Sequence, residues 1–333
     1  MDEKQLEPFI ARAPHRVNQK GATPDRRAAD FGALAILIRD AEITDVFANG
    51  AGEIWVDRGA GVVRDERLRL SEPELRALAV RLIGLGGRHI DEANPCVDVR
   101  LHDGIRVHAV LPPISPRGTL LSIRVPRREP FSLGSLDAAG FFELVPVEVV
   151  RALVMRRENL LITGAGGSGK TTFLSALLAE ATASERIVAI EDVAELRVAH
   201  PHFVSLEARQ ANLEGAGGFG LTQLLREALR MRPDRLVLGE CRGAEIRELF
   251  AALNTGHDGG AGTLHANSLV DVPSRLEALG ALAELSPAAT ARQAASAIGT
   301  VLHLERKAGQ RRLAQIGSFA LDERDRLRVV EAA

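Results

Sequence analysis

Two apolar patterns alternate along the second half of the chain. Short apolar runs predict buried strands, and stretches with an apolar residue every three or four positions predict helices. Strands are expected at Asn159–Thr163, Ile187–Ile190, Arg235–Leu238 and around Thr263–His265; helices at Lys170–Ala181, Thr222–Arg230, Ala244–Asn254, Val272–Leu285 and Pro287–Ile298; and a final hairpin from Thr300–Glu305 and Arg312–Phe319. Because strands and helices alternate, the predicted fold class is α/β, a mostly parallel sheet with flanking helices.

The preceding part of the chain has a different pattern, with short strands separated by Gly, Asp and Pro. These strands are expected at Ile43–Gly50, Glu53–Asp57, Val97–Leu101, Arg106–Val110 and Thr119–Arg124, with a short apolar helix at Phe31–Arg39. The segment Ser71-Glu-Pro-Glu74 has the composition of a capping box and predicts the start of a longer helix. Apolar residues with helical spacing come after it, at Leu75, Leu78, Ala79, Leu82 and Ile83. This part therefore predicts a smaller α+β domain.

These patterns divide the chain into four parts. We expect an N-terminal arm at residues 1–30, the α+β domain at 31–127, a linker at 128–144 and the α/β domain at 145–333. The linker prediction rests on Pro126, Arg127, Arg128 and Pro130, which interrupt regular structure. A linker at this point would allow one domain to rotate relative to the other.

The composition is that of a soluble globular protein. The chain has 333 residues, enough for about two domains, of which 46% are apolar and 26% charged. The net charge of −2 gives no general attraction to nucleic acid. Cys96 and Cys241 indicate neither a disulfide framework nor a zinc site. The N-terminus lacks the apolar region of a signal peptide, and no apolar stretch is long enough to span a bilayer. We therefore expect a cytoplasmic protein.

A glycine-rich segment joins the first predicted strand of the α/β domain to its first helix. Gly164-Ala-Gly-Gly-Ser-Gly169-Lys170-Thr171 fits the P-loop pattern G-x-x-x-x-G-K-[ST] in its strand–loop–helix context. Backbone N–H groups and the helix N-terminus would bind phosphates, Lys170 would reach the β- and γ-phosphates, and Thr171 would ligate Mg²⁺. The predicted nucleotide-binding residues are Gly164, Ala165, Gly166, Gly167, Ser168, Gly169, Lys170, Thr171 and Thr172. A chance glycine-rich turn is the alternative, but Lys170 is one of only four lysines in the chain.

Two further apolar runs end in carboxylates. Leu236-Val-Leu-Gly239 leads to Glu240, and Ile187-Val-Ala-Ile190 leads to Glu191 and, shortly afterwards, Glu195. In a parallel α/β sheet the ligand lies at the carboxyl ends of the strands, so these side chains are expected near the phosphates. Carboxylates there can hold Mg²⁺ through water or activate the attacking water. We predict Thr171, Glu191 and Glu240 as metal ligands and leave open which of Glu191, Glu195 and Glu240 activates water.

Structural roles are the alternative for these carboxylates. Glu240 can cap its strand or pair with Arg242, and the other two can stabilise a solvated helix start.

Two histidines lie in the glycine-rich segment between the predicted helix 244–254 and the next strand. His257 and His265 do not have a usual zinc spacing. One would close a helix and the other would end a strand, which indicates a γ-phosphate sensor; a structural histidine on an apolar strand is the alternative.

Together these segments resemble the motifs of a known family. Four segments resemble, in order, the Walker A, Asp, Walker B and His boxes of the type II/IV secretion ATPases. They are GAGGSGKTT, IEDVAEL, LRMRPDRLVLGECRGAE and NTGHDGGAGTLHANS. The N-terminal ITDVFANG, EIWVDRG and LSIRVPRR are also similar to that superfamily. The likeness covers about residues 40 to 300 and is greatest to the tight-adherence (Flp-type) pilus assembly branch. It implies a RecA-like P-loop domain preceded by a smaller domain.

The resemblance also implies roles for individual residues. Glu191 and Glu195 would belong to the Asp box, Glu240 to Walker B, and His257 and His265 would contact or sense the γ-phosphate. Relatives form hexameric rings that hold ATP and Mg²⁺ between their two domains, with arginines of the smaller domain completing the site. The corresponding positions are Arg100, Arg106 and Arg124, and Arg230 and Arg232 fall in the nucleotide-binding RMRPDR segment. A surface or inter-domain salt bridge is the alternative for each arginine.

The resulting expectation is a hexameric, Mg²⁺-dependent ATPase that drives pilus assembly or secretion through inter-domain motion. It would act at the inner face of the cell membrane through an inner-membrane platform protein. The first rival is a nucleic-acid-stimulated ring motor, against which the charge balance and the absence of interleaved aromatic and basic residues argue. The second rival is a regulatory subunit without turnover, which the full set of acidic and histidine boxes disfavours.

Overall fold

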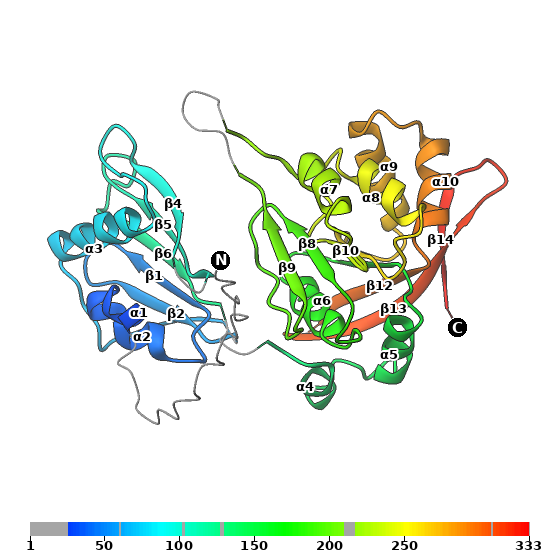
Figure 1. The fold of residues 1–333 in the computed structure, drawn as a ribbon. Coiled ribbons are helices and arrows are strands. Elements are labelled where there is room, and N and C mark those ends of the chain that lie inside the picture. The colour runs from blue at the N-terminus through cyan, green and yellow to red at the C-terminus, as the bar shows by residue number, and fades with distance from the viewer. Residues whose placement is uncertain are drawn as a thin grey trace, which may run out of the picture. The chain divides into compact units, whose positions relative to one another are not determined.

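The chain forms two compact units. The computed structural model describes residues 26–59, 61–101, 104–126, 130–209, 217–307 and 309–332. The first unit is Met1–Val125 and the second is Pro126–Ala333 (Figure 1). Most of the predicted N-terminal arm, residues 1–25, lies outside the described residues. No helix in the described ranges is both long and apolar enough to cross a bilayer.

An antiparallel sheet forms the frame of the first unit. Its strand order is β3-β2-β1-β6-β5-β4, with every described neighbour pair antiparallel. The strands are β1 (Asp45–Asn49), β2 (Ile54–Asp57), β3 (Val62–Arg64), β4 (Cys96–Arg100), β5 (Arg106–Val110) and β6 (Leu120–Arg124). The helical segments are α1 (Arg26–Ala29), the 3-10 turn η1 (Gly32–Leu34), α2 (Ala35–Arg39) and α3 (Glu72–Leu85). All five predicted strands are present, and β3 is an edge strand that the sequence did not reveal.

Helix α3 begins where the sequence predicted. The Ser71 backbone N–H donates to Glu74 Oε2 at 2.8 Å, as expected of a capping box. The apolar side chains predicted for this helix are buried against the sheet: Leu75, Leu78, Ala79, Leu82 and Ile83. The side chains that alternate with the buried ones on β4, β5 and β6 are half-buried or exposed, so the other face of the sheet is the more open one.

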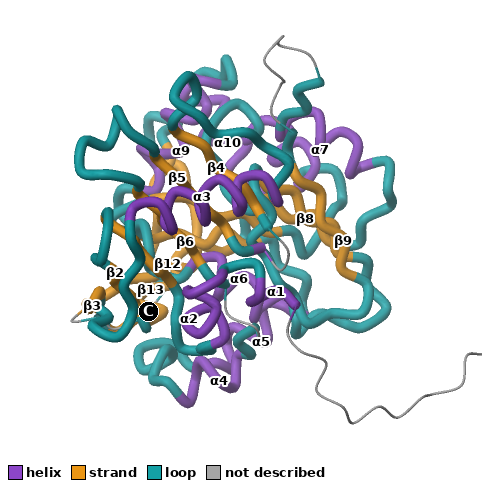
Figure 2. Tube along the Cα trace, turned by 90° about the vertical axis from the view of Figure 1, so that its left-hand side faces the viewer, coloured by secondary structure: helices purple, strands orange, loops and turns teal. Residues whose placement is uncertain are grey.

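The second unit contains an eight-stranded sheet with the order β14-β13-β12-β7-β11-β10-β8-β9. The strands are β7 (Leu160–Gly164), β8 (Ile187–Glu191), β9 (Phe203–Glu207), β10 (Arg235–Leu238), β11 (Ala261–His265), β12 (Thr300–Lys307), β13 (Gln310–Leu321) and β14 (Leu327–Glu331). From β12 to β9 all neighbours are parallel, while β13 and β14 run antiparallel. The mostly parallel sheet and the final hairpin are therefore confirmed. The sequence missed β9, which lies beside β8 (Figure 2), and β14.

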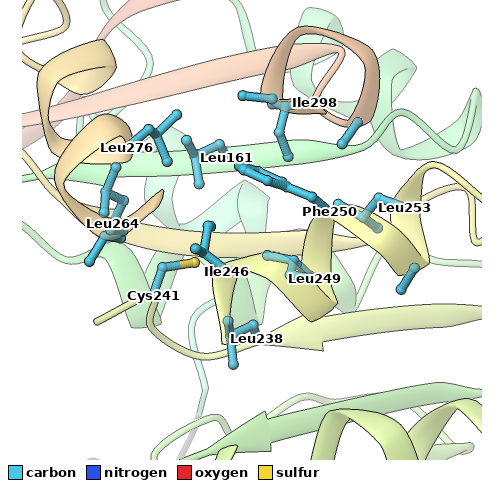
Figure 3. Close-up of a cluster of buried hydrophobic side chains, with 14 of the residues drawn as sticks. Leu161, Leu238, Cys241, Ile246, Leu249, Phe250, Leu253, Leu264, Leu276 and Ile298 are labelled. Atoms are coloured by element: carbon cyan, nitrogen blue, oxygen red, sulfur yellow. The ribbon is translucent and has the colours of Figure 1, made fainter. Parts of the chain in front are cut away.

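Helices cover both faces of this sheet. They are α4 (Leu133–Ala138), α5 (Val147–Met155), α6 (Lys170–Leu178), α7 (Leu221–Leu229), α8 (Ile246–Leu253), α9 (Val272–Leu282) and α10 (Pro287–Ala297). Residues of α7, α8, α9 and α10 share one hydrophobic cluster with strand residues such as Leu161, Leu238 and Leu264 (Figure 3). Residues of α4, α5 and α6 form a second cluster with Ile162 and Val237. Because β7 contributes side chains to both clusters, its backbone is held from both sides.

The segment predicted as a linker, residues 128–144, needs correction. In its described part, from residue 130 onward, Leu133, Leu136 and Phe142 are buried in the core of the second unit. The Phe141 and Phe173 rings lie 5.1 Å apart between centroids. The linker was predicted from the prolines and arginines of this segment. Its apolar residues instead pack against α6, so the second unit begins earlier than residue 145.

Candidate functional site

The register of β7 brings three segments to one edge of the sheet. Gly164, the last residue of β7, pairs with His265 of β11 on one side and with Leu304 of β12 on the other. All three strands are parallel, so the residues at the ends of β7 and β11 and just beyond them lie at the same carboxyl edge. The predicted P-loop and His265 therefore meet there.

Three glycines of this loop have positive φ angles, which strain the backbone of any residue that carries a Cβ. Gly164, Gly167 and Gly169 have φ values of 150°, 72° and 97°. A Cβ on Gly164 would lie 2.5 Å from the Leu304 carbonyl oxygen, so β12 and the loop approach too closely for a side chain. Gly169 is the N-cap of α6. The glycines thus allow a tight turn from β7 into α6.

The loop has the properties of a phosphate cradle. A Cβ on Gly167 would meet nothing within 4 Å, and one on Gly166 would meet only the His265 ring, at 3.9 Å, so space is open beside both. Ser168 Oγ is buried, and no group among the described residues hydrogen-bonds to it. The N-terminus of α6 adds its positive end. These features fit a bound phosphate chain.

Lys170 is held inside the loop. It is only 7% exposed, and its Nζ donates to the carbonyl oxygens of Gly164, at 2.9 Å, and Ala165, at 3.0 Å. Burial lowers the pKa of Lys170 from its ordinary value, and the negative charge of Glu240 opposes that shift. The ammonium is therefore already positioned in the cradle.

His265 bridges Lys170 and Glu240. Its Nδ1 lies 3.3 Å from Lys170 Nζ, and its Nε2 lies 2.9 Å from Glu240 Oε1. The neutral tautomer with its proton on Nε2 satisfies both contacts, because Nε2–H donates to the carboxylate and Nδ1 accepts from the ammonium. Burial and then the Lys170 charge lower the pKa of His265 below 6.5, while Glu240 raises it. His265 is therefore neutral at neutral pH.

Arg242 donates hydrogen bonds to two carboxylates at the edge of this site. Its guanidinium donates to Glu240 Oε2 at 2.7 Å and to Asp192 Oδ2 at 3.1 Å. Glu195, an exposed residue, lies near enough to contribute to the raised pKa of Arg242, behind the larger effects of Glu240 and Asp192. The predicted pairing of Glu240 with Arg242 is thus present, together with a contact between Glu240 and His265. Asp192, which we did not predict as a site residue, also belongs to the group.

Glu191 is placed differently from its predicted role. Its side chain is 4% exposed, and Oε1 accepts the backbone N–H groups of Glu195, at 2.9 Å, and Leu196, at 3.1 Å. A Cβ on Gly239 would lie 2.5 Å from Glu191 Cγ, so that glycine makes room for the carboxylate. Glu191 therefore shapes the loop that carries Asp192 and Glu195, an arrangement that does not favour direct metal ligation.

Magnesium fits the remaining residues. Thr171 is half-buried in the first turn of α6, beside Lys170. Among the described residues, no three His, Cys, Asp or Glu side chains are grouped to hold a metal ion. Mg²⁺ at nucleotide sites needs only one or two protein ligands, because phosphate and water oxygens supply the rest. Thr171 and Glu240 as magnesium ligands therefore stay a prediction.

His257 is not brought to the P-loop of its own chain, which corrects the prediction that it contacts the γ-phosphate there. Its Nδ1 lies 3.1 Å from the Ala252 carbonyl oxygen in the last turn of α8. It precedes β11, whereas His265 ends that strand, and a strand of this length spans about 13 Å. His257 therefore lies at the amino edge of the sheet.

A network of ion pairs and hydrogen bonds lies at that amino edge of the sheet. The buried Arg235 donates to Glu185 at 2.8 Å, and Arg157 contacts the same carboxylate and the carbonyl oxygen of Asp258. These bonds anchor the start of β10 and the turn after His257. A buried ion pair of this kind is costly to break, so the edge is well suited to a structural role.

Arg230 and Arg232 also lie at the amino edge. Arg230 is the C-cap of α7 and pairs with Glu227 at 2.8 Å, and both arginines precede β10. Their predicted contact with nucleotide is therefore not made with the P-loop of the same chain.

The three arginines of the first unit that were predicted as site residues form a row. Arg100 pairs across the sheet with Arg106, and Arg106 pairs with Arg124. Each alternates with buried neighbours, so all three occupy the open face of the sheet. Like charges on directly opposite residues destabilise a sheet. Asp45 of β1 lies opposite Arg124, so the row is a basic stripe that is bordered by a carboxylate on one side.

One residue at the P-loop had no signal in the sequence. Arg311 of β13 donates from Nε to the Gly167 carbonyl oxygen at 2.9 Å. It lies 144 positions from that glycine along the chain, and only the pairing of β13 with β12 and of β12 with β7 brings it there.

The family of the chain is established by comparison with known proteins. A model described as type II/IV secretion system protein matches residues 27–324, and the chain belongs to this family. The putative conjugal transfer protein MT3759 of Mycobacterium tuberculosis (strain CDC 1551) is 47% identical over 292 residues, covering 86% of this chain and 83% of that protein. The type IV secretion system protein PtlH of Bordetella pertussis is 33% identical over 324 residues, covering 87% and 94%.

The fold has a counterpart among solved structures. The pilus retraction motor PilT with bound ADP matches with a TM-score of 0.59 and 19% identity, over 92% of this chain and 82% of that one. The expected RecA-like domain preceded by a smaller domain is confirmed, as is the resemblance to the superfamily. The tight-adherence branch remains a prediction.

The state of His265 can be measured directly. In protein with ¹⁵N-labelled histidines, we expect the His265 ring to be the Nε2–H tautomer at pH 7, with a pKa below 6.5. Lys170→Met should raise this pKa because a nearby positive charge is removed, and Glu240→Gln should lower it. Since the folded-state pKa is the lower one, the stability that His265 contributes is full above about pH 6.5 and decreases as the pH falls below it. An Nδ1–H tautomer, or a pKa above 6.5, would contradict the proposed contacts.

Proposed function

We propose that the protein is an ATPase whose P-loop, Glu240 and His265 form the hydrolytic site. The observation that carries this proposal is the chain of contacts from Lys170 through His265 to Glu240. In this proposal Lys170 would be the cation for the phosphates and Glu240 the carboxylate for the attacking water, and the His265 ring contacts both side chains. The same P-loop holds an open cradle and a buried hydroxyl that has no hydrogen-bond partner among the described residues.

In this proposal each residue has one task. The loop amides and Lys170 bind and orient the phosphates. Glu240 accepts a hydrogen bond from the attacking water and then its proton, while Arg242 and His265 hold the carboxylate in place. His265, neutral, donates through Nε2 and avoids repelling Lys170. Bound Mg²⁺ would neutralise phosphate charge beside Thr171. Catalysis is then mostly positioning and electrostatics, as is usual for phosphoryl transfer.

Lys170→Ala tests the proposal. The variant should lose phosphate release from Mg-ATP by at least about 100-fold, because the cradle loses its buried cation. Lys307→Ala removes another of the four lysines, one that is exposed at the end of β12, and should retain wild-type activity. Steady-state phosphate release by the two variants is the measurement. Near-normal turnover in Lys170→Ala would refute the assignment of this loop as the hydrolytic site.

We further propose that the arginine row completes a nucleotide site in a hexamer. Arg100, Arg106 and Arg124 lie opposite one another on β4, β5 and β6, and the second unit holds the P-loop. Support comes from the charge arrangement: three cations lie on adjacent strands beside a single carboxylate of the same row, Asp45, and a bound polyphosphate would add charge-assisted hydrogen bonds to them. His257, Arg230 and Arg232, at the amino edge, are the groups that a neighbouring copy could use.

Arg106 is the central member of the row, so its substitution is the most direct test of the role proposed for the row. Arg106→Ala should lower kcat by about 100-fold or more, because a transition-state cation is lost. Arg64→Ala, on the same face at the edge of the sheet, should have little effect. If the row acts on a neighbouring subunit, mixing inactive Lys170→Ala with inactive Arg106→Ala chains should restore part of the phosphate release. Equal turnover in the Arg106 and Arg64 variants would contradict the role of the row.

The machine that this ATPase would drive is a pilus or secretion apparatus. Membership of the type II/IV secretion family supports that class, and the finer assignment to tight-adherence pili is our proposal from the sequence motifs. We propose that the hexamer acts in the cytoplasm, at the inner face of the membrane, and transmits inter-domain motion to an inner-membrane platform protein.

A second candidate is a ring motor stimulated by nucleic acid, and one observation favours it. On the open face of the first sheet, Phe47 lies between Trp55 of β2 and Ser122 of β6, and Ser122 is two residues from Arg124. Aromatic rings beside a basic row resemble a surface on which unpaired bases stack. The sequence alone does not show this combination because the residues are separated along the chain.

A further inference from the structure

The hairpin of β12 and β13 projects past the P-loop. Leu304 of β12 is level with Gly164, and the strand continues to Lys307. On the returning strand β13, Arg311 pairs with Arg306, beyond the level of Gly164. Arg311 is therefore delivered to the carboxyl edge of the sheet, next to the phosphate cradle.

The Arg311 side chain lies across the glycines of the loop. Nε donates to the Gly167 carbonyl oxygen at 2.9 Å. Its Cδ is 3.1 Å from the position that a Cβ on Gly169 would occupy. The methylene groups of Arg311 thus pack beside Gly169 at the end of the loop, while its Nε–H is bonded to Gly167 in the middle of the loop.

This contact fixes one peptide unit at both ends. The Gly167 carbonyl accepts from Arg311, and the N–H of the same peptide, that of Ser168, donates to the Ala165 carbonyl oxygen at 3.3 Å. Glycines lose more backbone entropy on ordering than any other residue, and this loop has four of them. A side chain that holds the loop in its folded form lowers the cost of ordering it around a ligand.

We propose that Arg311 is a positioning residue that pre-organises the P-loop through its Nε–H bond to Gly167, so that the C-terminal hairpin sets the affinity for nucleotide. This inference rests on the proposed function, because it assumes that the loop binds ATP or ADP. It assigns Arg311 a role through the loop and not through direct contact with the phosphates.

Two substitutions separate these roles. In Arg311→Gln the amide nitrogen is bonded to Cδ, as Nε is in arginine, so an N–H donor remains while the charge is lost. In Arg311→Lys the charge remains, but a methylene replaces the donor at that position. A loop-positioning role requires the donor, whereas direct phosphate binding requires the charge.

The measurement is the equilibrium dissociation constant for Mg-ADP, with KM and kcat for ATP alongside. We expect Arg311→Lys to weaken ADP binding by about 10-fold, the value of one lost hydrogen bond to a charged group, and Arg311→Gln to stay within about threefold, since a neutral donor is weaker. KM should rise in the lysine variant while kcat changes less, because ground-state and transition-state binding both use the ordered loop. Arg306→Ala is the matched control. Its Nε contacts the hairpin's own Gly309 carbonyl, so ADP binding should not change.

The outcomes are distinct. Wild-type affinity in Arg311→Lys, with weak binding by Arg311→Gln, would overturn the positioning role in favour of a direct phosphate contact. Wild-type affinity in both variants would overturn it altogether. Failure of the wild-type protein to bind ADP would instead contradict the proposed function. Thermal unfolding of each variant identifies any loss that comes from misfolding.

Discussion

The parallel pairing of β7 with β11 and β12 is the constraint on which the candidate site depends. It puts Gly164 level with both His265 and Leu304, so the P-loop, the end of β11 and the tip of the β12–β13 hairpin lie at the same edge of the sheet. The close approach of Leu304 leaves no room for a Cβ at Gly164, so the turn into α6 is fixed by packing as well as by sequence. Helices on both faces, with their two hydrophobic clusters, keep β7 in that register.

On this frame the electrostatics are arranged around one neutral histidine. Lys170 is buried and positive, Glu240 faces it across His265, and Arg242 takes the other oxygen of the carboxylate. Protonating His265 would place a second positive charge beside Lys170. This repulsion adds to the effect of burial, and both lower the pKa of His265. Glu191, although it ends a neighbouring strand, uses its carboxylate to order the backbone after β8. Two acidic residues with similar sequence contexts therefore have different roles.

Much of the fold could be predicted because it depends on local patterns. The strand Arg235–Leu238 and the capping box at Ser71 appear as predicted, and the P-loop motif indicated its own conformation. The predictions for His257, Arg230 and Arg232 failed because a local pattern does not show which end of a strand lies at the site. His257 lies close to His265 in sequence, but a whole strand separates them. Arg311 and the alignment of Arg106 with its neighbours depend on strand register, which no local pattern reveals.

We propose that the P-loop edge hydrolyses ATP to drive a secretion-type machine and that this hydrolysis does not depend on nucleic acid. Steady-state phosphate release by the purified wild-type chain with Mg-ATP, measured with and without single-stranded DNA, tests it most directly. We expect the same turnover in both conditions, because every residue assigned to hydrolysis belongs to the protein itself. Turnover that appears only with DNA would contradict a secretion-type ATPase and favour the nucleic-acid motor, and no turnover in either condition would contradict the ATPase activity itself.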